Sequence, residues 1–240
     1  MTEPNQPRGL APVMRGASFS GLGTGARLLA ERVLAALPVG EGARVLDLGC
    51  GAGDIALLVH LARPEAQVCG IDFASANIAA AQKRVTRNGV SFVCADYLEW
   101  RSGTFDLIFA DSVLHLIDAP VAQLAGKLAA DLTPGGLVIA TVPDTAVINR
   151  AHLMLRRLWR RLPSAADRLV LEIAMRRYPG LPRQVLEDRL PYLRLLPRLF
   201  GPAEQREFAV SGLILQRNDP WPGPSLAKPR HRLMIWQGAA

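Results

Sequence analysis

The stretch VLDLGCGAGD, residues 45–54, decides the fold. It opens as a short apolar run, typical of a buried β-strand, and continues into three glycines at alternate positions, Gly49, Gly51 and Gly53. Glycines directly after a strand let the main chain approach a ligand closely, and the N-terminus of a following helix offers free N–H groups. The stretch therefore predicts a strand, a ligand-binding turn and a helix in succession.

Short apolar runs alternate with helical runs on both sides of this stretch. Strands separated by helices of ten or more residues predict βαβ units and a mostly parallel sheet that is buried on both faces. Ser75 is a candidate N-cap and Gly89 a candidate stop for the third helix. The predicted strands are residues 43–49, 66–72, 90–96, 104–111 and 135–143. The predicted helices lie within residues 23–42, where Pro38 and Gly40 close the first one, and within residues 54–64, 75–89 and 119–132.

The last hundred residues break this alternation. Residues 144–200 read as three or four consecutive helices, and residues 206–218 and 230–238 read as two strands joined by a Pro/Gly-rich loop. We therefore predict an α/β fold: a doubly wound, seven-stranded, mostly parallel sheet with a C-terminal antiparallel hairpin and a helical cap inserted after strand five. The predicted parts are a mobile N-terminal segment (1–24), a Rossmann-like core (25–143), a basic helical cap (144–200) and a hairpin completing the core sheet (201–240).

Four carboxylates occupy the predicted carboxyl ends of successive strands: Asp47, Asp72, Asp96 and Asp111. A single aspartate is usually a helix cap or a turn residue, but four on one rim of a sheet indicate a ligand. The G-x-G-x-G spacing differs from the G-x-G-x-x-G of dinucleotide sites. A carboxylate two residues before the first glycine would repel a pyrophosphate but could hold a loop or attract a cationic amine. The pattern therefore favours an amino-acid-like, positively charged ligand over a dinucleotide.

With these features in view, the chain resembles the class I S-adenosylmethionine-dependent methyltransferases over about residues 25–142 and the final hairpin. The resemblance implies S-adenosyl-L-methionine as cofactor and no metal. VLDLGCGAGD is similar to their motif I, and GIDFASANIAAAQKR is similar to their second motif, which holds the ribose-binding acid. VCADYLEW is similar to their adenine-contacting segment. FDLIFADSVLHLID is similar to their fourth strand, and LTPGGLVIATVP is similar to the stretch that leads into their fifth.

The resemblance assigns a role to each candidate residue. Gly49, Gly51 and Gly53 would pass under the methionine and ribose, with Asp47 ordering that loop near the amino group. Asp72 would accept hydrogen bonds from both ribose hydroxyls and Asp96 from the adenine amino group, and Ala110 or Asp111 would face the methionine portion. Phe73 and Tyr97 would enclose the adenine, although ordinary core packing explains both aromatic residues equally well.

The methyl group of a sulfonium is already activated, so the main task is to align a nucleophile behind it. His115 is the candidate base for a hydroxyl acceptor; its alternative is a structural histidine at a helix start. The predicted cap has four large side chains that either line a substrate pocket or pack the helices onto the sheet: Met154, Trp159, Met175 and Tyr178.

The net charge of +7 is concentrated in the cap, where residues 150–198 hold twelve arginines and four acidic residues. Three explanations stay open: a solvated helix face, an anionic partner such as an acyl carrier protein, a phosphorylated metabolite or an acidic membrane surface, and nucleic acid. The chain lacks the exposed aromatic platforms typical of RNA-binding enzymes, which disfavours nucleic acid. Oligomeric state is open.

No stretch is apolar enough to predict a membrane span or a secretory signal, so we expect a cytoplasmic protein. Cys50, Cys69 and Cys94 read as small core side chains rather than zinc ligands. The predicted function is methyl transfer to a small organic acceptor, anionic or carrier-bound, at oxygen or nitrogen, in secondary metabolism. The alternatives are an RNA-modifying methyltransferase and a non-catalytic protein of this fold that binds a partner through the basic cap.

Overall fold

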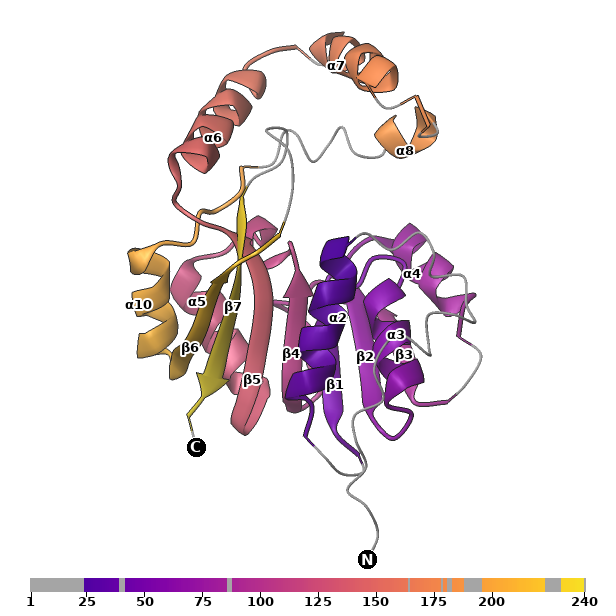
Figure 1. Cartoon of the computed structure of the whole chain (residues 1–240), viewed down its shortest axis with the longest axis vertical. Helices are drawn as coiled ribbons and strands as arrows, with labels where there is room; N and C mark the ends of the chain where they lie inside the picture. Colours follow the sequence, from indigo (N-terminus) through magenta and orange to yellow (C-terminus); the bar gives the residue numbers. More distant parts are fainter. Residues whose placement is uncertain are drawn as a thin grey trace, which may run out of the picture.

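A seven-stranded sheet forms the centre of the molecule, with the strand order β3-β2-β1-β4-β5-β7-β6 (Figure 1). The computed structural model describes residues 24–38, 42–85, 88–163, 165–177, 179–180, 183–187, 196–222 and 230–239. Outside the described residues lie almost all of the segment 1–24 that we expected to be mobile, together with Tyr178 and residues 223–229 of the loop between the last two strands. Thr24 is the one residue of the N-terminal segment that is described.

The first five strands run parallel, and β7 runs antiparallel to both of its neighbours, β5 and β6. The prediction of a doubly wound, mostly parallel sheet with an antiparallel C-terminal hairpin is therefore confirmed. The strands are β1 Arg44–Leu48, β2 Gln67–Asp72, β3 Val90–Cys94, β4 Phe105–Asp111, β5 Leu132–Pro143, β6 Leu213–Pro220 and β7 His231–Gly238.

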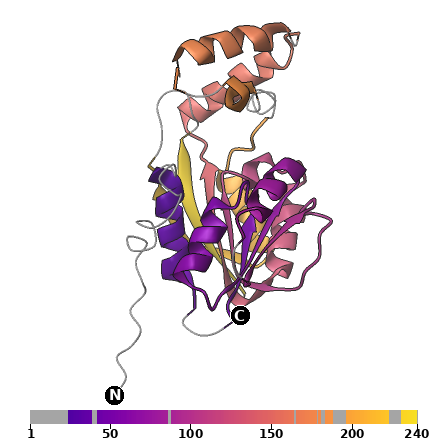
Figure 2. The same cartoon turned by 90° about the vertical axis from the view of Figure 1, so that its right-hand side faces the viewer.

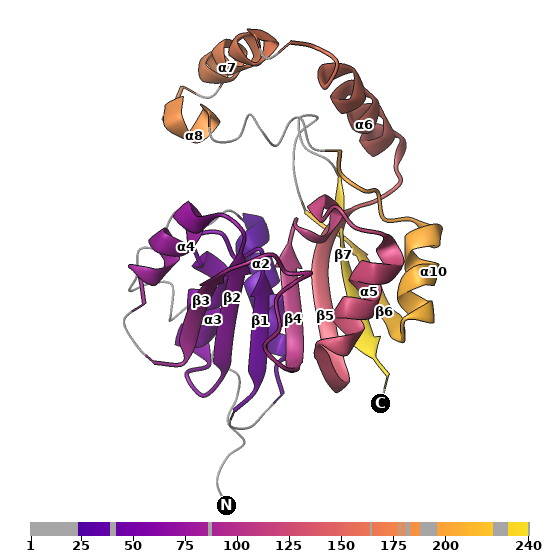
Figure 3. The ribbon, with the colours of Figure 1, turned by 180° about the vertical axis from the view of Figure 1, so that it is seen from behind.

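Helices cover both faces of the sheet (Figures 1 and 3). The helices α2 Thr24–Ala36, α3 Asp54–Ala62 and α4 Ser75–Gln82 pack on one face, and α5 Val121–Ala130 and α10 Pro202–Val210 pack on the other. A 3-10 helix, η2 Leu114–Leu116, follows β4. Because both faces are covered, neighbouring residues of β1 serve different cores: Val45 belongs to the core beneath α2, α3 and α4, and Leu46 belongs to the core beneath α5 and α10.

Several boundaries differ from the sequence prediction. Residues 206–210, predicted as strand, are the end of α10, whose start is fixed by Pro202 at the first turn and by Glu204, which accepts a hydrogen bond from the Gly201 amide at 2.9 Å. Ser75 is the first residue of α4 rather than its N-cap, and α4 ends at Gln82, well before Gly89.

The cysteines also depart in part from expectation. Cys50 is buried and Cys69 is half-buried, but Cys94, at the end of the edge strand β3, is exposed, so it is not a core residue. All three are free thiols.

The cap helices α6 Val147–Trp159, α7 Ala165–Arg177 and α8 Arg183–Glu187 form an arch beyond the carboxyl ends of the parallel strands (Figures 1 and 2). The N-terminal end of α6 is fixed by Asn149. Its side-chain amide nitrogen Nδ2 donates to Asp144 Oδ1 at 2.9 Å and to the Arg230 main-chain carbonyl at 2.7 Å. Among the described residues, none of the helices has the length and apolar character that crossing a bilayer requires.

The apolar residues of α6 do not pack onto the sheet as expected. Met154 is 56 % exposed and Leu158 is 55 % exposed, whereas the side turned toward the body carries buried Asn149 and half-buried Arg156. Half-buried Trp159 donates from Nε1 to Asp167 of α7 at 3.0 Å. The hydrogen bonds of Asn149 thus join α6 to the body, and the Trp159–Asp167 hydrogen bond joins α6 to α7.

Candidate active site

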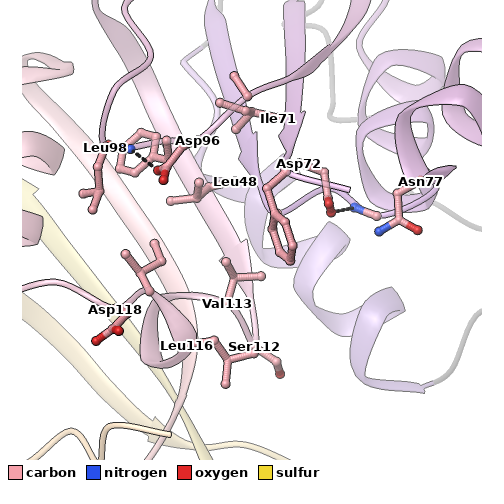
Figure 4. Close-up of a pocket in the computed structure, with 16 residues that line it drawn as sticks. Leu48, Ile71, Asp72, Asn77, Asp96, Leu98, Ser112, Val113, Leu116 and Asp118 are labelled. Atoms are coloured by element: carbon pink, nitrogen blue, oxygen red, sulfur yellow. Dashed lines mark hydrogen bonds between the residues drawn. The ribbon is translucent and has the colours of Figure 1, made fainter. Parts of the chain in front are cut away.

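A pocket of about 410 Å³ opens at the carboxyl ends of the parallel strands, between the turn after β1 and the segments that follow β2, β3 and β4 (Figure 4). Six of the ten candidate site residues line it: Gly49, Gly51, Asp72, Phe73, Asp96 and Tyr97. Asp47, Gly53, Asp111 and His115 do not line it. The structure thus gathers most of the predicted cofactor residues around one cavity and places the remainder behind or beside its wall.

The three glycines after β1 meet three different needs. All have positive φ angles, a conformation that L side chains rarely adopt. A Cβ at Gly49 would overlap Val113, and a Cβ at Gly53 would lie 2.5 Å from the ring of Phe92, so both positions are closed by the protein itself. Gly51 alone of the three opens onto empty space. The prediction that bare main chain faces a ligand therefore applies most directly to Gly51.

Asp72, at the end of β2, joins the glycine turn to the start of α4. Its Oδ2 accepts the Gly51 amide at 2.9 Å, and its Oδ1 accepts the Ala74 amide at 2.8 Å. Each carboxylate oxygen can accept more than one hydrogen bond, so both retain acceptor capacity toward the pocket. Figure 4 shows Asn77, which sequence reasoning missed, beside Asp72 on the same side of the cavity.

The opposite side of the pocket is built by the turn after β3. Asp96 Oδ1 accepts the Leu98 amide at 2.9 Å, which fixes its carboxylate at the pocket wall (Figure 4). Tyr97 is buried against Lys127, whose Nζ lies 4.7 Å from the ring centroid, and burial raises the pKa of its phenol. Phe73 is 76 % exposed at the pocket edge, so its ring is free to cover a ligand.

The end of β4 carries a strained residue, Ser112, that sequence reasoning also missed. Ser112 lines the pocket with φ 60, and its amide donates to Thr141 Oγ1 at 2.8 Å. The Thr141 hydroxyl in turn donates to Asp111 Oδ1 at 2.6 Å. Asp111 therefore supports the strained turn from behind instead of facing the cavity. Strain of this kind concentrates at binding and catalytic sites.

Asp47 is buried beneath the glycine turn, with 3 % of its surface exposed. Burial raises its pKa well above the ordinary value, and the negative charges of Asp111, Asp72 and Asp54 raise it further, while a hydrogen bond from the Ala56 amide opposes the shift. The site thus concentrates negative charge behind a glycine-lined wall, an arrangement that a cationic ligand would stabilise.

His115 lies in η2, behind the pocket wall formed by its neighbours Leu116 and Ile117. It is 7 % exposed, and its Nδ1 has no hydrogen-bond partner among the described residues. Its ring meets the edge of His231 at a centroid distance of 5.5 Å. Burial, followed by the charges of His231 and Arg156, lowers the pKa of His115 to about 3, so the imidazole is neutral at physiological pH.

Two arginines lie close to this histidine. Arg156 of α6 is half-buried, and burial lowers its pKa. Arg198 donates from its amide to the His115 carbonyl at 2.8 Å and from Nη2 to the Ala119 carbonyl. Its Nη1 is buried with no hydrogen-bond partner among the described residues. The region around His115 below α6, which does not itself line the pocket, is therefore basic, in contrast to the acidic floor around Asp47.

Residues 40–166 match the model of a family described as a methyltransferase domain. The match covers more than half of the chain, and the chain belongs to this family. Together with the fold and the pocket, this places the chain among the class I S-adenosylmethionine-dependent methyltransferases.

Curated relatives carry the name trans-aconitate 2-methyltransferase. That of Methylobacterium nodulans is 36 % identical over 138 residues, covering 57 % of this chain and 52 % of the relative. That of Acidovorax sp. is 35 % identical over 144 residues, covering 57 % of this chain and 54 % of the relative. The chain thus spans about half the length of the curated relatives it matches.

Solved structures agree with the fold. An S-adenosylmethionine-dependent methyltransferase from Mesorhizobium loti has a TM-score of 0.61 at 20 % identity, with 90 % of this chain and 98 % of that chain covered. The N-methyltransferase NodS from Bradyrhizobium japonicum, in complex with S-adenosyl-L-homocysteine, has a TM-score of 0.58 at 13 % identity, with 97 % and 100 % covered. At these identities the likeness shows the fold alone.

Proposed function

We propose that this methyltransferase transfers the methyl group to a carboxylate oxygen of a small organic acid. Residues 25–143 and 201–240 would carry the cofactor, and residues 144–200 would complete the acceptor site. The observation that carries the proposal is the basic cluster below α6. There Arg156 and Arg198, whose Nη1 has no hydrogen-bond partner in the described part of the chain, lie close to the neutral His115.

The cofactor would lie across the ends of β1, β2 and β3. Gly51 would let the main chain pass under it, Asp72 would accept the ribose hydroxyls, and Asp96 would accept the adenine amino group, with Phe73 and Tyr97 enclosing the ring. Asp47 and Asp111, with Gly49 and Gly53, would hold the turn in shape from behind. The negative charge of the floor complements the ammonium and sulfonium groups of the cofactor.

The protonation state of His115 favours a carboxylate acceptor over a hydroxyl. A hydroxyl must lose a proton during transfer, and a base with a pKa of about 3 removes that proton inefficiently at neutral pH. A carboxylate is already ionised and needs no base, only alignment behind the methyl group and neutralisation of its charge. Arginine supplies two parallel N–H groups that match a carboxylate.

The names of the curated relatives support the same acceptor class, since trans-aconitate is a small tricarboxylic acid. The basic side of the site is compatible with additional carboxylates on the acceptor. His115, behind the pocket wall, would support the acceptor site as a neutral structural group, and a role as a base is the alternative.

The test is transfer of label from S-adenosylmethionine carrying a radioactive methyl group. The full chain is incubated separately with a set of di- and tricarboxylic acids, a set of phenols and amines, and an RNA pool. We expect label in the acids, in a form that mild alkali releases as volatile methanol, because esters hydrolyse and methyl ethers and methylamines do not. Alkali-stable label, or label in RNA alone, would reject the proposal.

A pair of variants tests the basic cluster. Arg156→Gln should raise KM for the acid acceptor about tenfold, the effect of a lost charge-assisted hydrogen bond, with the affinity for S-adenosylmethionine unchanged. Arg160→Gln, an exposed arginine one turn further along the chain, is the matched control and should leave KM unaltered.

A further inference from the structure

Helix α6 presents an uninterrupted apolar stripe to solvent along its whole length. The spacing of its members places them on one face of the helix. On the opposite face of α6, Asn149 is buried and Arg156 is half-buried, so the apolar stripe points away from the protein body. The stripe consists of Val147 (82 % exposed), Met154 (56 %), Leu155 (61 %), Leu158 (55 %) and, just beyond the helix, Leu162 (44 %).

This orientation reverses the usual arrangement of an amphipathic helix, which turns its apolar side to the core. Scattered single apolar residues are ordinary on a protein surface, but a continuous row of long aliphatic side chains marks an interaction site. The neighbouring helix α7 adds Leu169 (63 % exposed) and Ile173 (57 % exposed), one turn apart.

The charge around the stripe indicates the chemistry of what it contacts. Residues 147–177 contain eight arginines and two acidic residues, and α6 itself contains no acidic residue. Arg150, Arg157 and Arg161 are exposed, and their spacing of seven and four residues places them in a row along one flank of the stripe. An aliphatic row beside a row of arginines is the pattern of a helix that lies in a lipid–water interface.

We propose that α6 binds the surface of an anionic lipid bilayer. The apolar stripe would enter the boundary between headgroups and acyl chains, and Arg150, Arg157 and Arg161 would contact lipid phosphates, with their aliphatic stems along the apolar layer. The cap forms one extremity of the molecule (Figures 1 and 2), so a flat surface can approach it without meeting the core.

The same observations disfavour a second copy of the chain as the occupant. Pairing two α6 helices through the stripe would bring their arginines together with no acidic residue on either helix to neutralise them. An acidic protein would satisfy the arginines, but the straight aliphatic row is better matched by a fluid apolar layer. Because the carboxyl ends of the strands face the cap, membrane binding would also bring the pocket to the lipid interface (Figure 1).

The proposal is tested by co-sedimentation of the full chain with vesicles. One set contains phosphatidylcholine alone, and the other contains phosphatidylcholine and phosphatidylglycerol at a ratio of about three to one. We expect stronger binding to the anionic set, with the difference decreasing as salt is raised, because headgroup attraction is screened. The double variant Leu155→Gln/Leu158→Gln should bind the anionic vesicles at least about tenfold more weakly, since it interrupts the stripe.

Two further double variants sharpen the result. Arg157→Gln/Arg161→Gln should lose about fivefold per arginine on anionic vesicles and nothing on neutral ones. Val210→Gln/Ile214→Gln, which removes two apolar residues of α10 and β6 that are 86 % and 52 % exposed, is the matched control and should bind as the parent does. Thermal unfolding and S-adenosylmethionine affinity, expected to be unchanged in all three, show that the variants are folded.

If the protein binds neither vesicle set, the proposal is wrong. Binding that the leucine variant retains places the lipid contact elsewhere and also overturns it. If sedimentation analysis without lipid instead shows a dimer that the leucine variant dissociates, the stripe is a subunit interface. Capture of an acidic protein through the stripe, without vesicle binding, would assign it to a protein partner.

Discussion

The carboxylate of Asp72 accepts a hydrogen bond from the main-chain amide of Gly51 at 2.9 Å. Gly51 lies in the turn that follows β1, the strand next to β2 in the sheet. This bond links the two segments with the strongest sequence signals, the glycine turn and the acidic end of β2. It orients the carboxylate at the pocket wall before any ligand arrives, and both oxygens keep capacity to accept further hydrogen bonds.

Asp72→Ala should weaken S-adenosylmethionine binding by about 1.5–3 kcal/mol, or roughly 10- to 100-fold in Kd, the range for a lost charge-assisted hydrogen bond. Isothermal titration calorimetry measures this change. Asp54→Ala is the matched control, because Asp54 lies three residues after Gly51 but pairs with Arg84 at the surface. Equal affinity in both variants would show that Asp72 does not hold the cofactor.

Asp47→Asn should have opposite effects on stability and on binding. The pKa of Asp47 is raised by burial and by neighbouring carboxylates, so its ionised form destabilises the folded protein at neutral pH, and stability is regained as pH falls through this raised pKa. Removing the charge should therefore raise the melting temperature of the ligand-free protein at neutral pH.

The same Asp47→Asn substitution should weaken cofactor binding by about 1 kcal/mol, because the floor of the pocket loses negative charge. Scanning calorimetry with and without S-adenosylmethionine tests both signs; a lower melting temperature would contradict the first.

Gly51→Ala and Gly53→Ala should separate binding from folding. Each places a side chain at a positive φ angle, which costs about 1–2 kcal/mol. Gly53→Ala should lose more stability, because its Cβ meets Phe92, whereas a Cβ at Gly51 meets only open space. Gly51→Ala should instead show the larger loss of cofactor affinity. Urea unfolding and calorimetry on the same preparations decide the order, and the reverse order would mean that the ligand does not pass over Gly51.

The buried histidine predicts a pH dependence of stability. With a folded pKa of about 3, His115 stays neutral while the unfolded chain takes up a proton below about pH 6.5. The free energy of unfolding should therefore fall as pH decreases from 6.5 toward 3, by about 1.4 kcal/mol per pH unit from this group. Urea unfolding of the parent and of His115→Gln at about pH 7.5 and pH 5.5 should show a smaller decrease in the variant. A decrease of the same size would mean that His115 titrates normally.

The alternation of apolar and helical runs was sufficient to predict the sheet, its two helical layers and the cluster of acids at its rim, because those features depend on local pattern and on the handedness of βαβ units. The end of α10 was missed because Phe208 and Val210 favour strands, although Pro202 and Glu204 together signal a helix start. Asn77 and Ser112 were missed because nothing local distinguishes a polar residue beside a pocket from one in solvent.

The orientation of α6 could not be read from periodicity. Its pattern defines two faces, but which face turns inward depends on the contact of Asn149 with Asp144 and Arg230, the last of which is more than eighty positions away in the chain. The individual roles of the glycines were likewise set by distant partners, Val113 for Gly49 and Phe92 for Gly53.

Asp144 and Phe200 form an isolated parallel bridge, and the Phe200 amide donates to the Pro143 carbonyl at 2.8 Å. The intervening fifty-odd residues consequently leave and rejoin the sheet at a single point. A segment attached in this way can be lengthened, shortened or exchanged without moving any strand, so the cap can change while the pocket at the ends of β1, β2 and β3 keeps its shape.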